Sequence, residues 1–275
     1  MERLPEKPDE FGLEIVNIIN EIRPDSNIKY NGKLQINIDG SFFDISNLFR
    51  MVNLDPDNGH EIVVKYFYTI FDFTDSEPEI DTNDLLSVVN RIMPRIITEK
   101  QANSLPNDVV TTIPWINECV ISFVIDFPKY TMSIRKDMLE NWNIRDPEEL
   151  YGFSLQNLWD ITKGITYDII ALKDDDGEQK AKGCMFNVKD GYDSSRILLP
   201  QIYRNMSAEL GNEYYVAIPS RDTYLAISSE HEPTLSKLLL KMQSEGEKEE
   251  LPHPLSEKLF LCVKDGVAPG ILEPI

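Results

Sequence analysis

The most specific pattern in this 275-residue chain is KDGYDSSRIL, which runs from Lys189 to Leu198. Asp190-Gly191 follows a predicted strand at 184–188 and indicates a turn, because glycine adopts backbone angles that other residues avoid. We expect a helix to begin near Ser195, with Asp193 or Ser194 accepting hydrogen bonds from its first amides. A turn and a capped helix account for most of this pattern without any function.

A predicted hairpin follows the motif. Residues 214–218 and 223–228 are rich in aromatic and apolar side chains and flank the polar loop 219–222, as expected of core strands. An alternative interpretation gives the motif and the loop a shared function, since the amides at a helix N-terminus and a guanidinium both favour an anion. The candidate binding residues are Tyr192, Asp193, Ser195, Arg196, Ser220, Arg221 and Asp222.

The amino-terminal third is predicted to hold a helix and a small sheet. Apolar residues recur at helical spacing over 9–23, and Pro24 ends that helix. Asn31-Gly32 separates two strand-like segments and is the strongest short signal for a hairpin turn. The segment 61–71 fits a strand or a helix, and its apolar stripe favours the helix.

The rest of the chain also mixes helices with hairpins. An apolar segment at 116–127 is predicted to be a strand, with 130–134 returning as its partner. Asp146-Pro147 starts a helix that is expected to run to about Thr162, with Asp at the cap and proline in the first turn. We expect this helix to bury Leu150, Phe153, Leu158 and Ile161.

These segments predict an α+β protein made of two mixed helix and antiparallel-sheet halves packed together. Acidic residues crowd the segment 72–84, which contains Pro78 and indicates an exposed connection. We therefore expect residues 1–80 to form a helix, a small β-meander and further helices. Residues 81–275 are expected to form a larger α+β domain that contains the 189–198 motif and the 214–228 hairpin.

The charge of the chain disfavours nucleic acid as a partner. Asp and Glu number 47 against 27 Lys and Arg, a formal net charge of −20 at pH 7. Such a field repels a phosphate backbone and anionic lipid. Two interpretations stay open. The charge either serves solubility alone or captures a basic partner protein, as in inhibitors, secretion chaperones and nucleic-acid mimics.

Complete reaction motifs are absent from the sequence, which favours a non-catalytic protein over an enzyme. It contains no GxxxxGK[ST] or GxGxxG phosphate loop, no GxSxG elbow and no HExxH motif. Cys119, Cys184 and Cys262 lie far apart among apolar residues, which indicates buried free thiols. The three histidines are isolated from these cysteines, so we expect neither a metal site nor a cofactor.

Two further features bear on location. The first ten residues are polar and acidic, unlike a signal peptide, and the apolar runs are shorter than the roughly 18 residues of a membrane span. We expect a cytoplasmic protein that does not enter the membrane.

The motif and the hairpin resemble the YtpQ-type family of uncharacterised bacterial cytosolic proteins. That family's pattern combines Asp-Gly-Tyr-Asp-x-Ser-Arg-Ile-Leu with a short helix and a hairpin of the Ala-x-Pro-x-x-Asp kind. The matching residues here are 189–198, Ala217, Pro219 and Asp222, and Leu272–Ile275 is similar to the family's closing segment. The resemblance implies a bacterial cytosolic protein and brings no established catalytic residues.

Two functional hypotheses follow. The first is a non-catalytic binding or regulatory protein that acts on a basic partner protein through an acidic surface, as a chaperone, immunity protein or inhibitor does. The alternative is an enzyme or small-anion binder with its site near Asp193 and Arg196. That alternative requires both side chains to converge with the 219–222 loop in a cleft, and an Arg196 held only by local carboxylates removes its basis. The sequence leaves the oligomeric state open.

Overall fold

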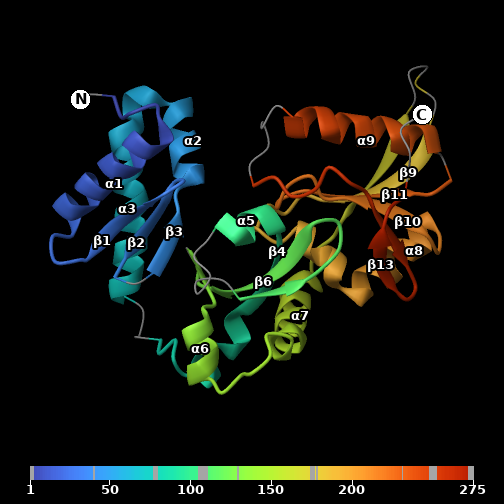
Figure 1. Cartoon of the computed structure of the whole chain (residues 1–275). Coiled ribbons are helices and arrows are strands. Elements are labelled where there is room, and N and C mark those ends of the chain that lie inside the picture. Colours follow the sequence, from blue (N-terminus) through green and yellow to red (C-terminus); the bar gives the residue numbers. More distant parts are fainter. Residues whose placement is uncertain are drawn as a thin grey trace. The chain divides into compact units, whose positions relative to one another are not determined.

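The computed structural model describes residues 3–39, 41–76, 80–104, 111–128, 130–173, 177, 179–230, 232–247 and 253–271. These residues confirm the predicted α+β class, with helices and antiparallel sheets in the same chain (Figure 1). The chain divides into two compact units. The first unit comprises Met1–Thr82 and Ile125–Ser133, and the second comprises Asn83–Val124 and Ile134–Ile275. Residues 77–79 of the predicted acidic connection and the closing segment Leu272–Ile275 lie outside the described residues.

The first unit packs helices against one face of a small antiparallel sheet whose strand order is β1-β2-β3. Its elements are α1 (Pro8–Ile22), β1 (Ile28–Gly32), β2 (Gln35–Ile38), β3 (Ser41–Asp44), α2 (Ser46–Leu54), the 3-10 helix η1 (Pro56–Asn58), α3 (Gly59–Ser76) and β7 (Thr131–Ser133). The helix predicted over 61–71 is confirmed as part of α3.

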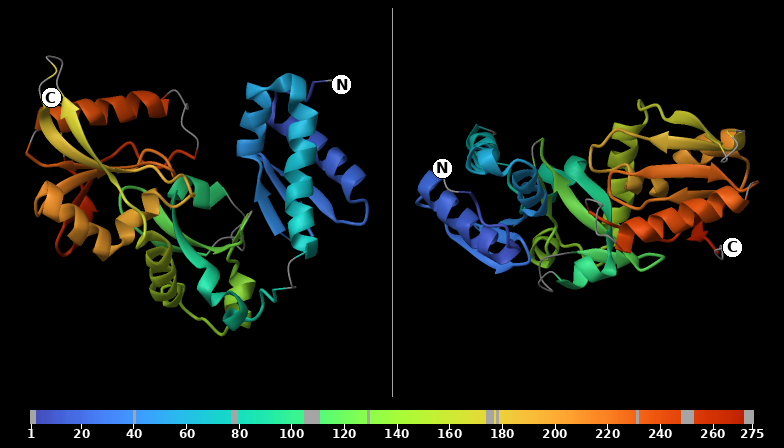
Figure 2. Two further views of the ribbon diagram at one scale, coloured as in Figure 1. Left: turned by 180° about the vertical axis from the view of Figure 1, so that it is seen from behind. Right: turned by 90° about the horizontal axis from the view of Figure 1, so that it is seen from above.

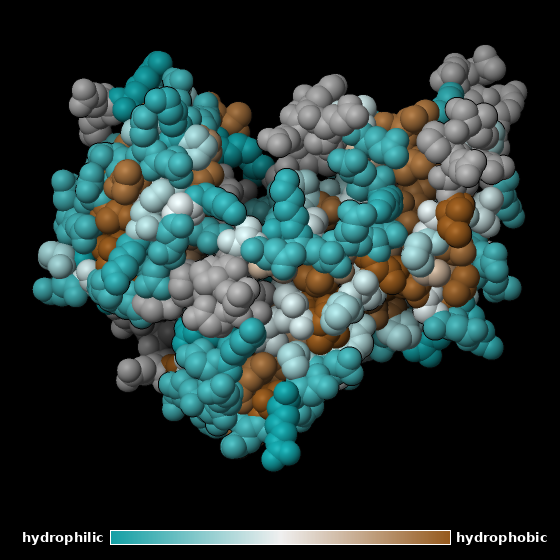
Figure 3. All heavy atoms as spheres, viewed as in Figure 1, coloured by the Kyte–Doolittle hydropathy of each residue, from teal (hydrophilic) through white to brown (hydrophobic). Residues whose placement is uncertain are grey.

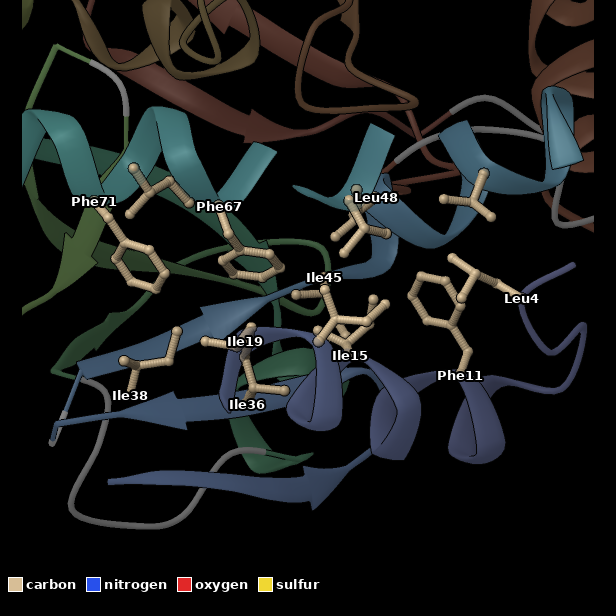
Figure 4. Packing of buried hydrophobic residues seen from close by; sticks show 14 residues of the cluster. Leu4, Phe11, Ile15, Ile19, Ile36, Ile38, Ile45, Leu48, Phe67 and Phe71 are labelled. Carbon is tan, nitrogen blue, oxygen red and sulfur yellow. The ribbon is translucent and has the colours of Figure 1, made fainter. Parts of the chain in front are cut away.

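Aliphatic and aromatic side chains from α1, α2, α3 and β2 make the core of the first unit. Figure 4 shows Phe67 and Phe71 of α3 pointing toward Ile36 and Ile38 of β2, with Ile19 of α1 beside them. Four of these five side chains are at most 5% exposed, and Phe71 is 7% exposed. Burial of this kind contributes about 1.5–3 kcal/mol for each large apolar side chain.

The hairpin between β1 and β2 turns two residues later than predicted. Gly32 pairs with Gln35, so Lys33 and Leu34 form the turn, with φ angles of 51° and 57°. The pairing shifts between Tyr30 and Gly32, which places an irregularity where the Asn31-Gly32 turn was expected. Leu34 packs against the core, and its amide donates to the Tyr30 hydroxyl at 3.1 Å, and these contacts favour the later turn.

The second unit is larger and contains two sheets in the described part of the chain. Its elements are α4 (Leu85–Val88), η2 (Val89–Arg91), β4 (Ile92–Thr98), α5 (Glu99–Ser104), β5 (Thr112–Pro114), β6 (Cys119–Asp126, whose last two residues belong to the first unit), α6 (Lys136–Asn141), α7 (Glu149–Thr162), β8 (Asp168–Lys173), β9 (Gln179–Phe186), η3 (Ser194–Leu198), α8 (Pro200–Leu210), β10 (Tyr214–Ala217), β11 (Tyr224–Ser228), α9 (Glu232–Glu247), β12 (Phe260–Val263) and β13 (Gly266–Pro269).

The larger sheet is antiparallel, with strand order β13-β12-β10-β11-β9-β8, and helices cover both of its faces. Figures 1 and 2 show α9 along one face and α8 on the other. Ala217 and Ile227 pack with Leu239 of α9. On the other face, Tyr203 of α8 stacks on Tyr214, with ring centroids 5.8 Å apart. The predicted 214–228 hairpin is confirmed as β10 and β11 in the middle of this sheet.

Helix α7 packs against β4 of the smaller sheet and begins at Glu149, two residues after the predicted start at Pro147. The Asp146 carboxylate accepts from the Glu148 amide at 2.9 Å, while Glu149 accepts from the Asp146 amide at 3.2 Å, the reciprocal pattern of a capping box. The predicted burial was wrong for two side chains: Phe153 is 46% and Ile161 42% exposed. The buried stripe follows every fourth residue instead: Leu150, Ser154, Leu158 and Thr162.

The three cysteines are free and buried, as the sequence predicts. Burial raises the pKa of Cys119 and Cys184 to about 11 and that of Cys262 to about 12. Among the described residues, no helix combines the length and apolar character that crossing a membrane demands.

Candidate functional site

The 189–198 motif begins with a tight backbone turn between β9 and η3. Lys189 and Gly191 both have positive φ angles, 58° and 85°. The Asp190 carboxylate accepts from the Tyr192 amide two residues on, at 3.0 Å, which is the hydrogen bond of an Asx-turn. Gly191 is required here, because a side chain at this φ is strained.

The predicted helix is a short 3-10 helix, and its predicted cap is absent from the described structure. Neither Asp193, which precedes η3, nor Ser194, its first residue, makes a side-chain capping bond. The Asp193 carboxylate instead accepts from the preceding Lys189 amide at 2.9 Å and from Arg196. The capping prediction was therefore wrong, because the buried guanidinium and the turn amide compete for the same carboxylate oxygens.

Arg196 is the largest fully buried side chain among the described residues, at 0% exposure. Its Nη1 lies 2.7 Å from Asp193 Oδ1 and 3.0 Å from Asp190 Oδ1, and its Nη2 lies 2.6 Å from Asp190 Oδ2. Its guanidinium carbon also lies 5.3 Å from the centre of the Phe186 ring on β9. The cation is thus neutralised inside the protein by the two carboxylates of its own motif.

The two carboxylates respond differently to this environment. Burial raises the pKa of Asp193 above its ordinary value, and the Lys189 amide and the Arg196 charge offset this only in part. Burial acts the same way on Asp190, but the hydrogen bonds and charge of Arg196 outweigh it, so the pKa of Asp190 lies below its ordinary value. Asp190 contacts Arg196 through both of its oxygens, whereas Asp193 contacts it through one.

The 219–222 loop contacts this motif through two hydrogen bonds. The Gly191 amide donates to Asp222 Oδ1 at 2.8 Å, and the Ser194 amide donates to the Arg221 carbonyl at 3.0 Å. Ser220 is hydrogen-bonded to Thr223 within the loop at 2.8 Å. The two segments, some thirty residues apart in the chain, therefore form one polar cluster.

Strand β4 adds a residue that the sequence did not indicate as part of the site. The Arg95 guanidinium carbon lies 5.2 Å from the centre of the Tyr192 ring. Next to it, the Ile96 amide donates to Ser195 Oγ at 3.4 Å. A signal existed, since Arg95 interrupts an otherwise apolar strand, and a charge in such a strand usually has a specific partner.

All seven predicted residues thus come together, but they differ in accessibility. Asp193, Ser195 and Arg196 are 0% exposed, Tyr192 2% and Ser220 3%. The side chains of Arg221 and Asp222 keep 22% and 30% of their surface exposed. A dissolved ligand can touch the rim of the cluster and not the Asp193–Arg196 pair. The described residues hold no group of three or more His, Cys, Asp or Glu side chains placed to bind a metal ion.

Comparison of the chain with protein-family models, curated proteins and solved structures finds no match. The resemblance to the YtpQ-type family stays a prediction that rests on the quoted motifs.

Proposed function

We propose that this protein is a non-catalytic, cytoplasmic member of a YtpQ-like family that binds a basic partner protein through its acidic surface. The observation that carries the proposal is the concentration of charge in the first unit. That unit holds 18 acidic against 8 basic residues, a net charge of −10 in 91 residues. The second unit reaches the same −10 with 29 acidic against 19 basic residues in 184.

Several acidic side chains of the first unit are exposed and so available to a partner. Helix α1 contains four acidic residues and no Lys or Arg, and Glu10 and Glu21 are exposed on it. Asp25 and Glu61 are exposed elsewhere in the unit. On the face drawn in Figure 3, hydrophilic residues cover most of this unit. A surface of this kind attracts a basic protein over several ångströms and speeds the encounter.

The motif itself favours this proposal over a site at Asp193 and Arg196. Both side chains are fully buried, and their charges are committed to each other, to Asp190 and to a backbone amide. Charges that are paired in the interior in this way are not exposed to a dissolved ligand.

Salt dependence of binding tests the proposal. Affinity for a lysine- and arginine-rich test peptide is measured by fluorescence anisotropy over a series of salt concentrations, with a glutamate-rich peptide as control. We expect the basic peptide to bind at low salt and to weaken steadily as salt screens the charges. The immobilised protein should likewise retain basic proteins from a bacterial extract at low salt. Absence of binding to the basic peptide at low salt would contradict the proposal.

A further inference from the structure

We propose that the side-chain amide of Asn31 is a site of spontaneous deamidation, which converts this residue into aspartate or isoaspartate. The sequence holds two Asn-Gly pairs, Asn31-Gly32 and Asn58-Gly59. An asparagine followed by glycine is open to attack by the next backbone nitrogen, because glycine has no side chain to obstruct the approach. The two pairs consist of the same residues, so their surroundings in the fold determine which of them reacts.

The reaction needs only the chain itself and water. The Gly32 backbone nitrogen bonds to Asn31 Cγ and gives up its proton, while the side-chain nitrogen takes that proton and leaves as ammonia. Water then opens the resulting succinimide ring at either carbonyl carbon, which yields aspartate or isoaspartate, and no atom is oxidised or reduced. Each product carries a carboxylate in place of a neutral amide, so the reaction adds one negative charge to the first unit.

The surroundings of Asn31 allow this attack. In the β1–β2 ladder Tyr30 pairs with Ile36 and Gly32 pairs with Gln35, so Asn31 is the extra residue of a β-bulge and has no partner on β2. Asn31 is exposed, and within the part of the chain that the structure describes its side chain makes no hydrogen bond or ion pair. A Cβ atom built on Gly32 would meet nothing within 4 Å, so the space beside the attacking nitrogen is open.

The second pair is held in place on both sides. The Asn58 side-chain nitrogen donates to the two carboxylate oxygens of Asp55, at 3.1 and 2.9 Å. Gly59 is the first residue of α3, and a Cβ atom built on it would lie 2.8 Å from the Val52 side chain of α2. Attack on Asn58 must therefore break the hydrogen bonds to Asp55 and displace the packed start of α3. We expect Asn58 to keep its amide far longer than Asn31.

Peptide mapping by mass spectrometry tests the assignment. The folded, unmodified protein is incubated at mildly alkaline pH, where the attacking nitrogen loses its proton more readily, and the deamidated fraction at each asparagine is followed over time. We expect Asn31 to deamidate about tenfold faster than Asn58 or more, because a hydrogen bond to a charged group must first break at Asn58. In urea, where both segments are unfolded, the two rates should become similar.

The substitution D55A provides a matched variant, because it removes the acceptor that holds Asn58 and leaves β1 unchanged. We expect it to raise the rate at Asn58 several-fold and to leave the rate at Asn31 as it is. Equal rates at Asn31 and Asn58 in the folded, unmodified protein, or a slower rate at Asn31, would overturn the proposal. None of these results depends on the basic partner, because no ligand is added.

Discussion

Asp190 holds two parts of the 189–198 motif in place. It holds the turn through the Tyr192 amide and neutralises Arg196 with both of its oxygens. Removing one partner of a buried ion pair leaves the other charge desolvated, which costs far more than losing an exposed pair. The Asp190–Arg196 contact therefore stabilises the fold at neutral pH.

The substitution D190N tests this role. We expect it to lower the free energy of unfolding at pH 7 by about 2–3 kcal/mol, because Arg196 loses a carboxylate that it contacts through both oxygens. The pKa of Asp190 is lowered in the folded state, so its contribution is present above the ordinary Asp pKa and is lost as the pH falls through the lowered value. D190N should therefore remove part of the acid dependence of stability, measured by urea denaturation between neutral and acidic pH.

A matched control is D137N, which removes an exposed carboxylate paired with Arg135 at 2.9 Å. Asp137 keeps 59% of its side-chain surface exposed, and such pairs contribute about 0–1 kcal/mol. Equal destabilisation by D190N and D137N would show that the buried cluster does not hold the fold.

The sequence indicated the motif, but it predicted the wrong hydrogen bonds for Asp193. Asp193 has the sequence position of a helix cap, but its carboxylate binds Arg196 instead. The spacing of residues in the sequence does not reveal that Arg196 is fully buried. Arg95 was missed because it lies about a hundred residues away and only the fold brings β4 beside Tyr192.

At the scale of elements, the sequence correctly predicted the features that depend on residues close together in the chain. The capping box of α7 and the apolar stripe of α3 both appear where the sequence placed them. The wrong predictions concern features that depend on packing between elements. Phe153 and Ile161 lie beside the buried stripe of α7 rather than on it, and the β1–β2 turn moved to Lys33 and Leu34.

Gly12 shows how one residue couples a helix to a strand. A Cβ atom at Gly12 of α1 would lie 2.1 Å from the ring of Tyr30 on β1. We expect G12A to destabilise the protein by about 1–3 kcal/mol through overpacking, despite the higher helix propensity of alanine. Thermal unfolding followed by circular dichroism measures this change.

Gly152 of α7 provides the control, because a Cβ atom there has no neighbour within 4 Å. G152A should stabilise the protein by about 0.5–1 kcal/mol, as alanine does in an exposed helix interior. If both variants shift the melting temperature in the same direction, the close contact between α1 and β1 is not correct.

At the scale of the whole molecule, the reactivity of the three thiols measures whether the protein interior is accessible to a reagent. Cys119, Cys184 and Cys262 are buried, with pKa values of about 11, 11 and 12, so almost no thiolate exists at neutral pH. We expect none of the three to react with Ellman's reagent in the native protein and all three to react in denaturant. Reaction of a thiol at the same rate with and without denaturant would contradict the described burial.

Charge at the same scale connects the structure to the proposed function. Each unit carries a net charge of −10, but the first unit has about half the residues of the second. Two variants that change the net charge equally, one in each unit, can therefore distinguish binding at a surface of the first unit from attraction by the net charge of the whole protein.

The most direct measurement compares two such variants in their affinity for the lysine- and arginine-rich peptide. E21Q/D25N/E61Q neutralises three exposed carboxylates of the first unit, and E213Q/E230Q/E257Q neutralises three exposed carboxylates of the second. We predict that the first variant binds several-fold more weakly than the second at about 0.1 M salt, because the Debye length of about 10 Å then screens distant charges more than local ones. Equal affinities of the two variants would contradict a docking surface on the first unit.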